Sequence, residues 1–191
     1  MKKKDLWVFL TLGFVALVPV ARAEHEVFVP ANDVSFTLSL ERDTYKIGDH
    51  ILLKYKIKNI SNAALFAPRS VWTVECPPKP LVWAWFEDSS GNHFRGGYAG
   101  SCSTPTPSSI SERMKKEAVL LKPTEEIEGI FVLPADWFGG LKPGAYRIEA
   151  SLDGWLETDF TQAQRADLAN MAFPFLNGQA VASITIKLQP R

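Results

Sequence analysis

The amino-acid sequence predicts an all-β protein, an antiparallel β-sandwich of seven to nine short strands with one short helical insertion before the last strand. Several short runs alternate apolar and polar residues, which is the period of a strand with one buried and one wet face. Turn-forming residues separate these runs. Only the segment 161–171 has apolar residues at helical spacing.

The first two strands are predicted within residues 34–60, on either side of a turn at 45–49. In each run every second residue is apolar, so one face of each strand is suited to a core. The polar face of the second run carries Lys54, Lys56 and Lys58. We expect these lysines to pair across the sheet with acidic residues such as Glu126 and Glu128.

Further strands are predicted along the rest of the chain. They lie at 65–74, 81–86, 93–95, 118–121, 127–133, 146–152 and 184–188. Residues 88–92 predict a hairpin turn, and residues 98–111, rich in Gly, Ser, Thr and Pro, predict an irregular loop. An inserted loop at about 154–178 separates the last two strands and contains the predicted helix, with Thr161 as its N-cap.

Residues 1–23 have the features of a secretory signal peptide. Lysines at positions 2–4 precede an apolar run of about fifteen residues, shorter than the roughly 20 that span a bilayer as a helix. Small residues at Ala21 and Ala23 suit a signal peptidase. We therefore expect cleavage between Ala23 and Glu24, and a periplasmic or secreted domain at 24–191 with no stable membrane span; a retained N-terminal anchor is the alternative.

The charge balance gives no indication of nucleic-acid binding. The whole chain carries 21 basic and 21 acidic residues, and cleavage would remove four of the former and one of the latter. The mature chain is therefore mildly acidic, whereas a nucleic-acid-binding domain shows a clustered basic surface.

The two cysteines, Cys76 and Cys102, are expected to form a disulfide in an oxidising compartment. Closing a loop of this length stabilises a fold by roughly 3.5 kcal/mol in the chain-entropy model. A redox-active or metal-binding pair is the alternative. The sequence has no Cys-x-x-Cys spacing to favour it, and we expect no metal and no cofactor.

The reactive side chains give little support for catalysis. The only histidines are His25, His50 and His93, and neither a Gly-x-Ser-x-Gly nor a His-Glu-x-x-His motif occurs. We therefore expect a protein without enzymatic activity and without catalytic residues. A hydrolase that uses His93 with a nearby serine is the competing hypothesis.

Aromatic residues provide the stronger functional indication. Trp83 and Trp85 fall on one face of a predicted strand whose other face is also apolar. This face is covered either by another part of the chain or by a protein or glycan that it binds. The candidate binding aromatics, on this strand and in connecting segments, are Trp83, Trp85, Trp137, Phe138, Trp155, Phe173 and Phe175.

Turn and core residues carry a family resemblance. They are Tyr45-x-x-Gly48-Asp49, Asn59-x-Ser61, Leu121-Lys122-Pro123, Trp137 and Pro143-Gly144-x-Tyr146. In this order they resemble bacterial immunoglobulin-like domains, and in particular the BsuPI-like proteinase-inhibitor domains. The resemblance covers about 34–152 and implies an immunoglobulin-like β-sandwich.

The sequence thus predicts a module that binds another protein of the cell envelope, with proteinase inhibition as the specific function that the resemblance implies. A structural or adhesion component of the envelope is the alternative within the same class.

Overall fold

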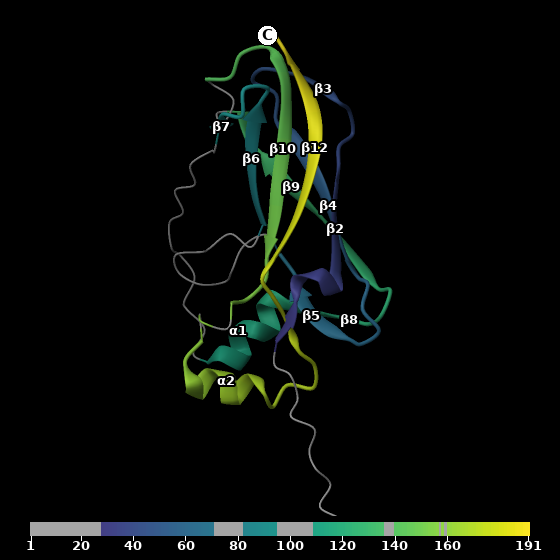
Figure 1. Ribbon diagram of the computed structural model, residues 1–191, viewed down its shortest axis with the longest axis vertical. Coiled ribbons are helices and arrows are strands. Elements are labelled where there is room, and N and C mark those ends of the chain that lie inside the picture. The colour runs from purple at the N-terminus through teal and green to yellow at the C-terminus, as the bar shows by residue number, and fades with distance from the viewer. Residues whose placement is uncertain (1–27, 71–81, 95–108, 136–139, 157, 159) are drawn as a thin grey trace, which may run out of the picture.

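A computed structural model describes residues 28–70, 82–94, 109–135, 140–156, 158 and 160–191 (Figure 1). These residues form a β-sandwich, which confirms the predicted all-β class, but they include twelve strands where seven to nine were expected, and three of the strand pairings are parallel. One sheet has the order β3 (Thr44–Lys46), β12 (Gln179–Gln189), β10 (Gly144–Asp153), β6 (Val82–Asp88) and β7 (His93–Phe94). The sheet facing it consists of β2 (Val34–Ser39), β4 (Ile51–Asn59) and β9 (Glu126–Leu133).

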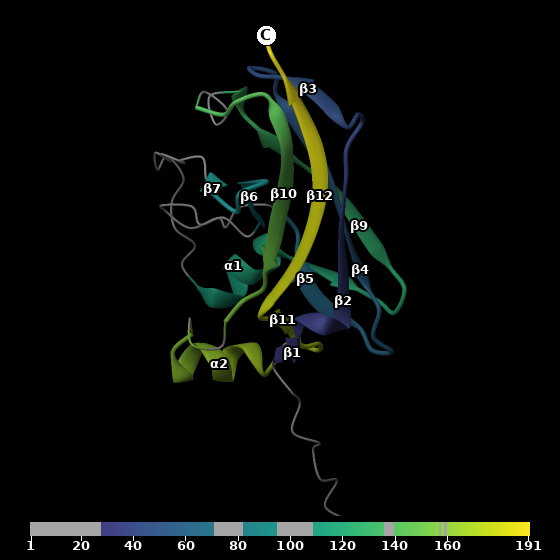
Figure 2. The same cartoon turned by 45° about the horizontal axis from the view of Figure 1, so that its top comes forward.

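A third sheet lies at the end of the sandwich far from the C terminus, together with the two helices (Figure 1). Its order is β1 (Phe28–Pro30), β11 (Phe175–Asn177), β5 (Leu65–Pro68) and β8 (Ala118–Leu121). The helices are α1 (Ile110–Glu117) and α2 (Gln162–Leu168), and a 3-10 turn, η1 (Ala31–Asp33), joins β1 to β2. Figure 2 shows β1 beside β11, with which it pairs in parallel.

The main core lies between the first two sheets, as the alternating runs predict. On β4, Leu53 and Ile57 are at most 1% exposed, and from the other sheet Ile148 and Leu152 are fully buried in the same cluster. The intervening residues of each strand point outward. The alternation therefore defines an inner face and an outer face for both sheets.

The outer face of β4 has the ion pairs that the lysines predict. Lys56 Nζ lies 2.7 Å from Glu126 and 3.0 Å from Glu128, and Lys54 Nζ lies 3.1 Å from Glu41. These bonds raise the pKa of Lys56, and the bond from Lys56 lowers the pKa of Glu126. Two of the three lysines on this face therefore have acidic partners within the chain, and no ion pair of Lys58 is found among the described residues.

A second, smaller core holds the helices to the end of the sandwich. It consists of Ile110, Met114, Ala118, Trp155, Phe160, Leu168 and Phe175. Helix α2 was expected, and Thr161 caps it in a capping box with Gln164, at 2.9 and 3.3 Å. Helix α1 was not expected, because its first residues fall in the Ser- and Pro-rich stretch that predicted a loop.

The inserted segment 154–178 is not only a loop with a helix, since its strand β11 pairs in parallel with both β1 and β5.

The turn predicted at 45–49 is shorter than expected. Tyr45 and Lys46 belong to β3, and the chain reverses between Lys46 and Asp49, where Gly48 adopts a φ of 101°. The Pro143-Gly144 turn also favours a positive φ at Gly144, but this residue does not adopt one and is already paired with Leu188 in β10.

Candidate binding groove

A groove of about 570 Å³ lies on the outer face of the sheet that contains β6 and β10. Its lining residues are Trp83, Trp85, His93, Ser151, Asp153 and Gln179. They come from four strands, β6, β7, β10 and β12, that are neighbours in one sheet. The backbone under the groove is therefore a hydrogen-bonded sheet, which holds these side chains in fixed relative positions.

The two tryptophans reach this face because the core takes the alternate residues of β6. Val82, Ala84 and Phe86 are 1–3% exposed in the main core, whereas Trp83 and Trp85 point outward and are half-buried. Pairing with β10 places Ser151 opposite Trp83 and Glu149 opposite Trp85. Each indole thus has a polar neighbour across the strands.

One end of the groove is a hydrogen-bonded cluster around Asp153. Ser151 Oγ donates to Asp153 Oδ1 at 2.6 Å, and Gln179 Nε2 donates to the same oxygen at 3.1 Å. Gln179 Nε2 also donates to Ser151 Oγ at 2.7 Å. Both of these bonds go to Oδ1, and none to Asp153 Oδ2 is found among the residues that the structure describes.

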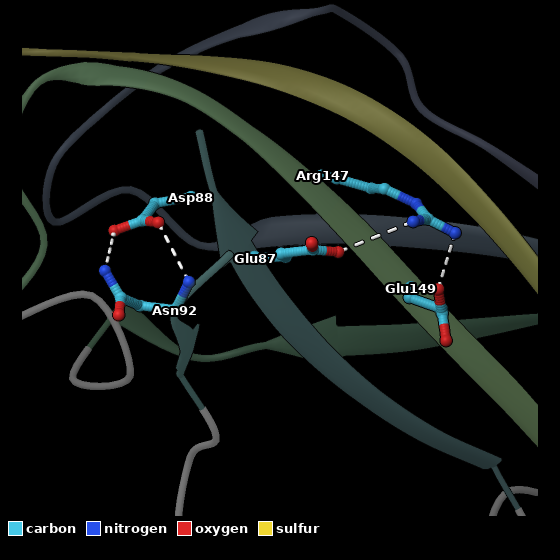
Figure 3. Close-up of polar contacts among 5 residues, drawn as sticks. All are labelled: Glu87, Asp88, Asn92, Arg147 and Glu149. Carbon is cyan, nitrogen blue, oxygen red and sulfur yellow. Dashed lines mark hydrogen bonds and ion pairs between the residues drawn. The ribbon is translucent and has the colours of Figure 1, made fainter. Parts of the chain in front are cut away.

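The other end is formed by the β6–β7 hairpin (Figure 3). Arg147 lies 3.4 Å from Glu87 and 2.6 Å from Glu149, and Glu87 pairs with His93 across the hairpin. The hairpin turn is held by Asp88, whose carboxylate accepts from the side chain and the backbone N–H of Asn92 (Figure 3). These bonds lower the pKa of Asp88.

The other candidate aromatics do not line this groove. Trp155 and Phe175, which sequence reasoning considered as contact residues, are 2% and 0% exposed and pack edge-to-face at 5.6 Å between ring centroids in the second core. Phe173 is half-buried and lies edge-on to Phe66. Trp137, Phe138, Cys76, Cys102 and residues 1–23 lie outside the described residues.

His93 lies in the groove but away from its serine. Ser151 is opposite Trp83, whereas His93 is opposite Glu87. Glu87 is four residues after Trp83 on β6, which corresponds to about 14 Å along the strand. The Ser151 hydroxyl is instead bonded to Asp153. A base within hydrogen-bond reach of the nucleophile is needed for hydrolysis, and His93 is not so placed for Ser151.

Among the residues that the structure describes, no group of three or more His, Cys, Asp or Glu residues is arranged to hold a metal ion. The same part of the chain has no candidate for a membrane-spanning helix.

The segment Asn59-Ile60-Ser61 has the pattern of an N-glycosylation sequon, but Asn59 has a structural role. Its side chain is fully buried, and its Nδ2 donates to the carbonyls of Ala63 and Leu121 at 2.8 and 2.9 Å. Its Oδ1 accepts from the backbone and hydroxyl of Ser61. Because both amide hydrogens are bonded in the core, the folded protein does not present this nitrogen for modification.

Sequence reasoning missed Ser151, Asp153 and Gln179. The alternation along β10 does place Ser151 and Asp153 on the outer face. The register that brings Gln179 beside them could not be derived, because the segment 154–178 lies between the two strands.

Comparisons with known proteins support no transfer of function. No family model and no curated protein sequence matches the chain. A β-glucosidase from Erythrobacter marinus is similar at a TM-score of 0.40 and 14% identity over 82% of this chain. The CARDB domain of a Pyrococcus furiosus protein in complex with di-metal ions is similar at 0.39 and 16% identity, over 83% of this chain and 94% of that domain.

A Listeria innocua β-glucosidase in complex with gluconolactone is similar at a TM-score of 0.38 and 14% identity, over 81% of this chain. This chain corresponds to 15% and 16% of the length of the two β-glucosidases. At such identities and TM-scores, no activity, metal or ligand can be carried over from these proteins.

Proposed function

We propose that this protein is a binding module without enzymatic activity, which recognises another protein of the cell envelope through the groove on β6 and β10. The observation that carries the proposal is the pair of half-buried tryptophans that line a groove on a rigid sheet. Tryptophan is enriched where protein interfaces have their energetic centre, because it offers a large apolar area with few rotatable bonds.

The arrangement of polar groups favours binding over catalysis. The Ser151 hydroxyl donates to Asp153 and accepts from Gln179. His93 pairs with Glu87 across the hairpin and does not lie opposite Ser151. A hydrolase would need the base beside the nucleophile. Absence of turnover is therefore part of the proposal.

Location in the periplasm or outside the cell is a further part of the proposal, and it rests on the signal-peptide features of residues 1–23. Proteinase inhibition is its most specific form and rests on the sequence resemblance alone. That form predicts a stable complex with a protease and no release of cleaved product.

Affinity capture from native envelope extracts tests the proposal. The wild-type protein is compared with Trp85→Ala, which removes one wall of the groove, and with Val132→Ala, an exposed residue of β9 on the other sheet as a matched control. We expect wild type and Val132→Ala to retain one protein that Trp85→Ala loses. Equal retention by all three variants would contradict the proposed binding face, provided that denaturation shows Trp85→Ala to be folded.

A further inference from the structure

Strand β9 lies at an edge of its sheet. The order of that sheet is β2, β4, β9, so β9 has one neighbouring strand among the described residues. It is eight residues long, whereas the other strands that end a sheet in the described part of the chain have two to six residues. A long edge strand offers a row of backbone donors and acceptors to a further strand.

The hydrogen bonds of β4 show which backbone groups of β9 face this edge. The N–H of Asn59 donates to the carbonyl of Glu125 at 3.0 Å, and these two residues continue the β4–β9 register as a hydrogen-bonded pair. Such pairs recur at every second residue, so the odd-numbered residues of β9 bond to β4. The even-numbered residues direct their N–H and C=O groups away from β4. They are Glu126, Glu128, Ile130 and Val132.

The side chains of these four residues divide the edge into an acidic half and an apolar half. Glu126 and Glu128 are both ion-paired within the chain. Ile130 and Val132 are 53% and 50% exposed, and Leu52, opposite Val132 on β4, is 37% exposed. Strand β9 contains neither of the residues, lysine and proline, that commonly block pairing at an edge. The apolar half is therefore suited to a further strand.

We propose that the edge of β9 pairs antiparallel with β9 of a second copy of this chain. Two-fold pairing about Phe131 places Ile130 of each copy opposite Val132 of the other. Both residues direct their backbone groups to this edge, so each such pair exchanges both of its hydrogen bonds. The same register joins the two exposed apolar patches and removes them from water.

The charge pattern favours a second copy over another strand. In this register the acidic halves of the two strands lie at opposite ends of the pairing, where Glu126 and Glu128 keep Lys56 of their own chain. A parallel arrangement would bring the glutamates of the two copies side by side, which is destabilising. An acidic strand would be repelled in the same way, and a basic strand would compete with Lys56. The inference is independent of the proposed function, because the groove lies on the other sheet.

Sedimentation velocity of the purified protein over a range of concentrations tests the inference. We expect wild type to form a dimer at concentrations below about 1 mM. Ile130→Pro removes an N–H that points to the edge and no bond to β4, so it should keep the fold and raise the dimer dissociation constant at least about tenfold. Ile130→Glu keeps the backbone N–H, places a charge in the centre of the pairing and should act in the same direction. Val181→Glu is the control, since Val181 is also 50% exposed but lies on β12 of the other sheet.

Amide exchange of wild type identifies the edge that pairs. The amides of Ile130 and Val132 should exchange more slowly in the concentrated protein than in the dilute protein. The amides of Ile127 and Gly129 bond to β4 and should be protected equally at both concentrations.

A monomer at every concentration up to about 1 mM would overturn the inference. So would a dimer that neither Ile130 variant weakens, or one that Val181→Glu weakens as strongly as Ile130→Glu does. Unchanged exchange of Ile130 and Val132 on dimerisation would place the contact elsewhere. Urea denaturation checks that the variants are folded, and if Ile130→Pro is not, Ile130→Glu decides.

Discussion

Trp83 lies directly opposite Ser151 in the antiparallel pairing of β6 with β10. A large indole therefore faces one of the smallest polar side chains, and the difference in size creates a depression between the two strands. Ser151 is fully buried and bonded to Asp153, so the carboxylate is held at the edge of this depression. This residue pair and its register therefore contribute to the groove, whose lining also includes residues of β7 and β12.

Two of the buried tyrosines, Tyr45 and Tyr146, should respond in opposite ways to loss of the hydroxyl. Tyr146 Oη donates to the carbonyl of Lys142 at 2.9 Å and accepts from its N–H at 3.2 Å, as in a tyrosine corner. Tyr45 Oη, by contrast, is buried and has no hydrogen-bond partner among the residues that the structure describes. Tyr146→Phe should lower the free energy of unfolding by about 1–2 kcal/mol. Tyr45→Phe should leave it unchanged or raise it. Urea denaturation of both variants measures the difference, and equal losses would contradict these assignments.

Asn59 should be sensitive to a change of one atom. In Asn59→Asp the two donors to Ala63 and Leu121 are lost and a charge is buried, which should cost about 3 kcal/mol of unfolding free energy. Asn62→Asp makes the same change at an exposed position and should cost less than about 0.5 kcal/mol. Chemical denaturation checks both, and a mild effect of Asn59→Asp would show that the buried bonds contribute little.

The sequence predicts the sandwich well because long strands show their alternation. The runs of β4 and β10 have nine and ten residues, enough to identify both faces without knowledge of their neighbours. Strands β1, β3 and β11 have three residues each and pair with segments far away in the chain, so no local pattern could indicate them.

The same reasoning finds only part of the groove. Trp83 and Trp85 follow from alternation in β6, but Ser151, Asp153 and Gln179 meet them only through the register of three strands. Trp155 and Phe175 show the opposite error, since the sequence predicts them as binding residues and the structure buries them. They lie in a connecting segment, but α1 and α2 cover them in a second core that sequence patterns did not reveal.

The second core depends on one buried acid. Glu117 is fully buried, accepts two bonds from Arg113 Nε at 3.0 Å and one from Trp155 Nε1 at 3.3 Å. Glu117→Gln should lower the free energy of unfolding by about 3 kcal/mol, because it removes a buried carboxylate that is paired with the Arg113 guanidinium. Lys116→Gln, which removes an exposed pair with Glu112 on the same helix, should cost less than about 0.5 kcal/mol. Thermal or chemical unfolding distinguishes them; similar costs would exclude a special role for Glu117.

The hairpin beside the groove should show a defined dependence on pH. The Asn92 side chain lowers the pKa of Asp88 from its ordinary value of 3.8, so its stabilising effect is present above 3.8 and is lost as the pH falls through the lowered pKa. Asn92→Ala should raise the Asp88 pKa, and its stability deficit should shrink in acid. Ser90→Ala is the control, because Ser90 bonds Asp88 only through its backbone N–H. A carboxyl ¹³C titration that shows the same Asp88 pKa in both variants would refute the assignment.

The central claim, that the outer face of β6 and β10 is the binding face, is tested most directly by hydrogen exchange of the captured complex. In the complex, the backbone amides of residues 82–94 and 147–153 should exchange more slowly than in the free protein, and those of residues 126–133 on the opposite sheet should exchange at an unchanged rate. Protection confined to 126–133, with 82–94 exchanging as in the free protein, would contradict the claim.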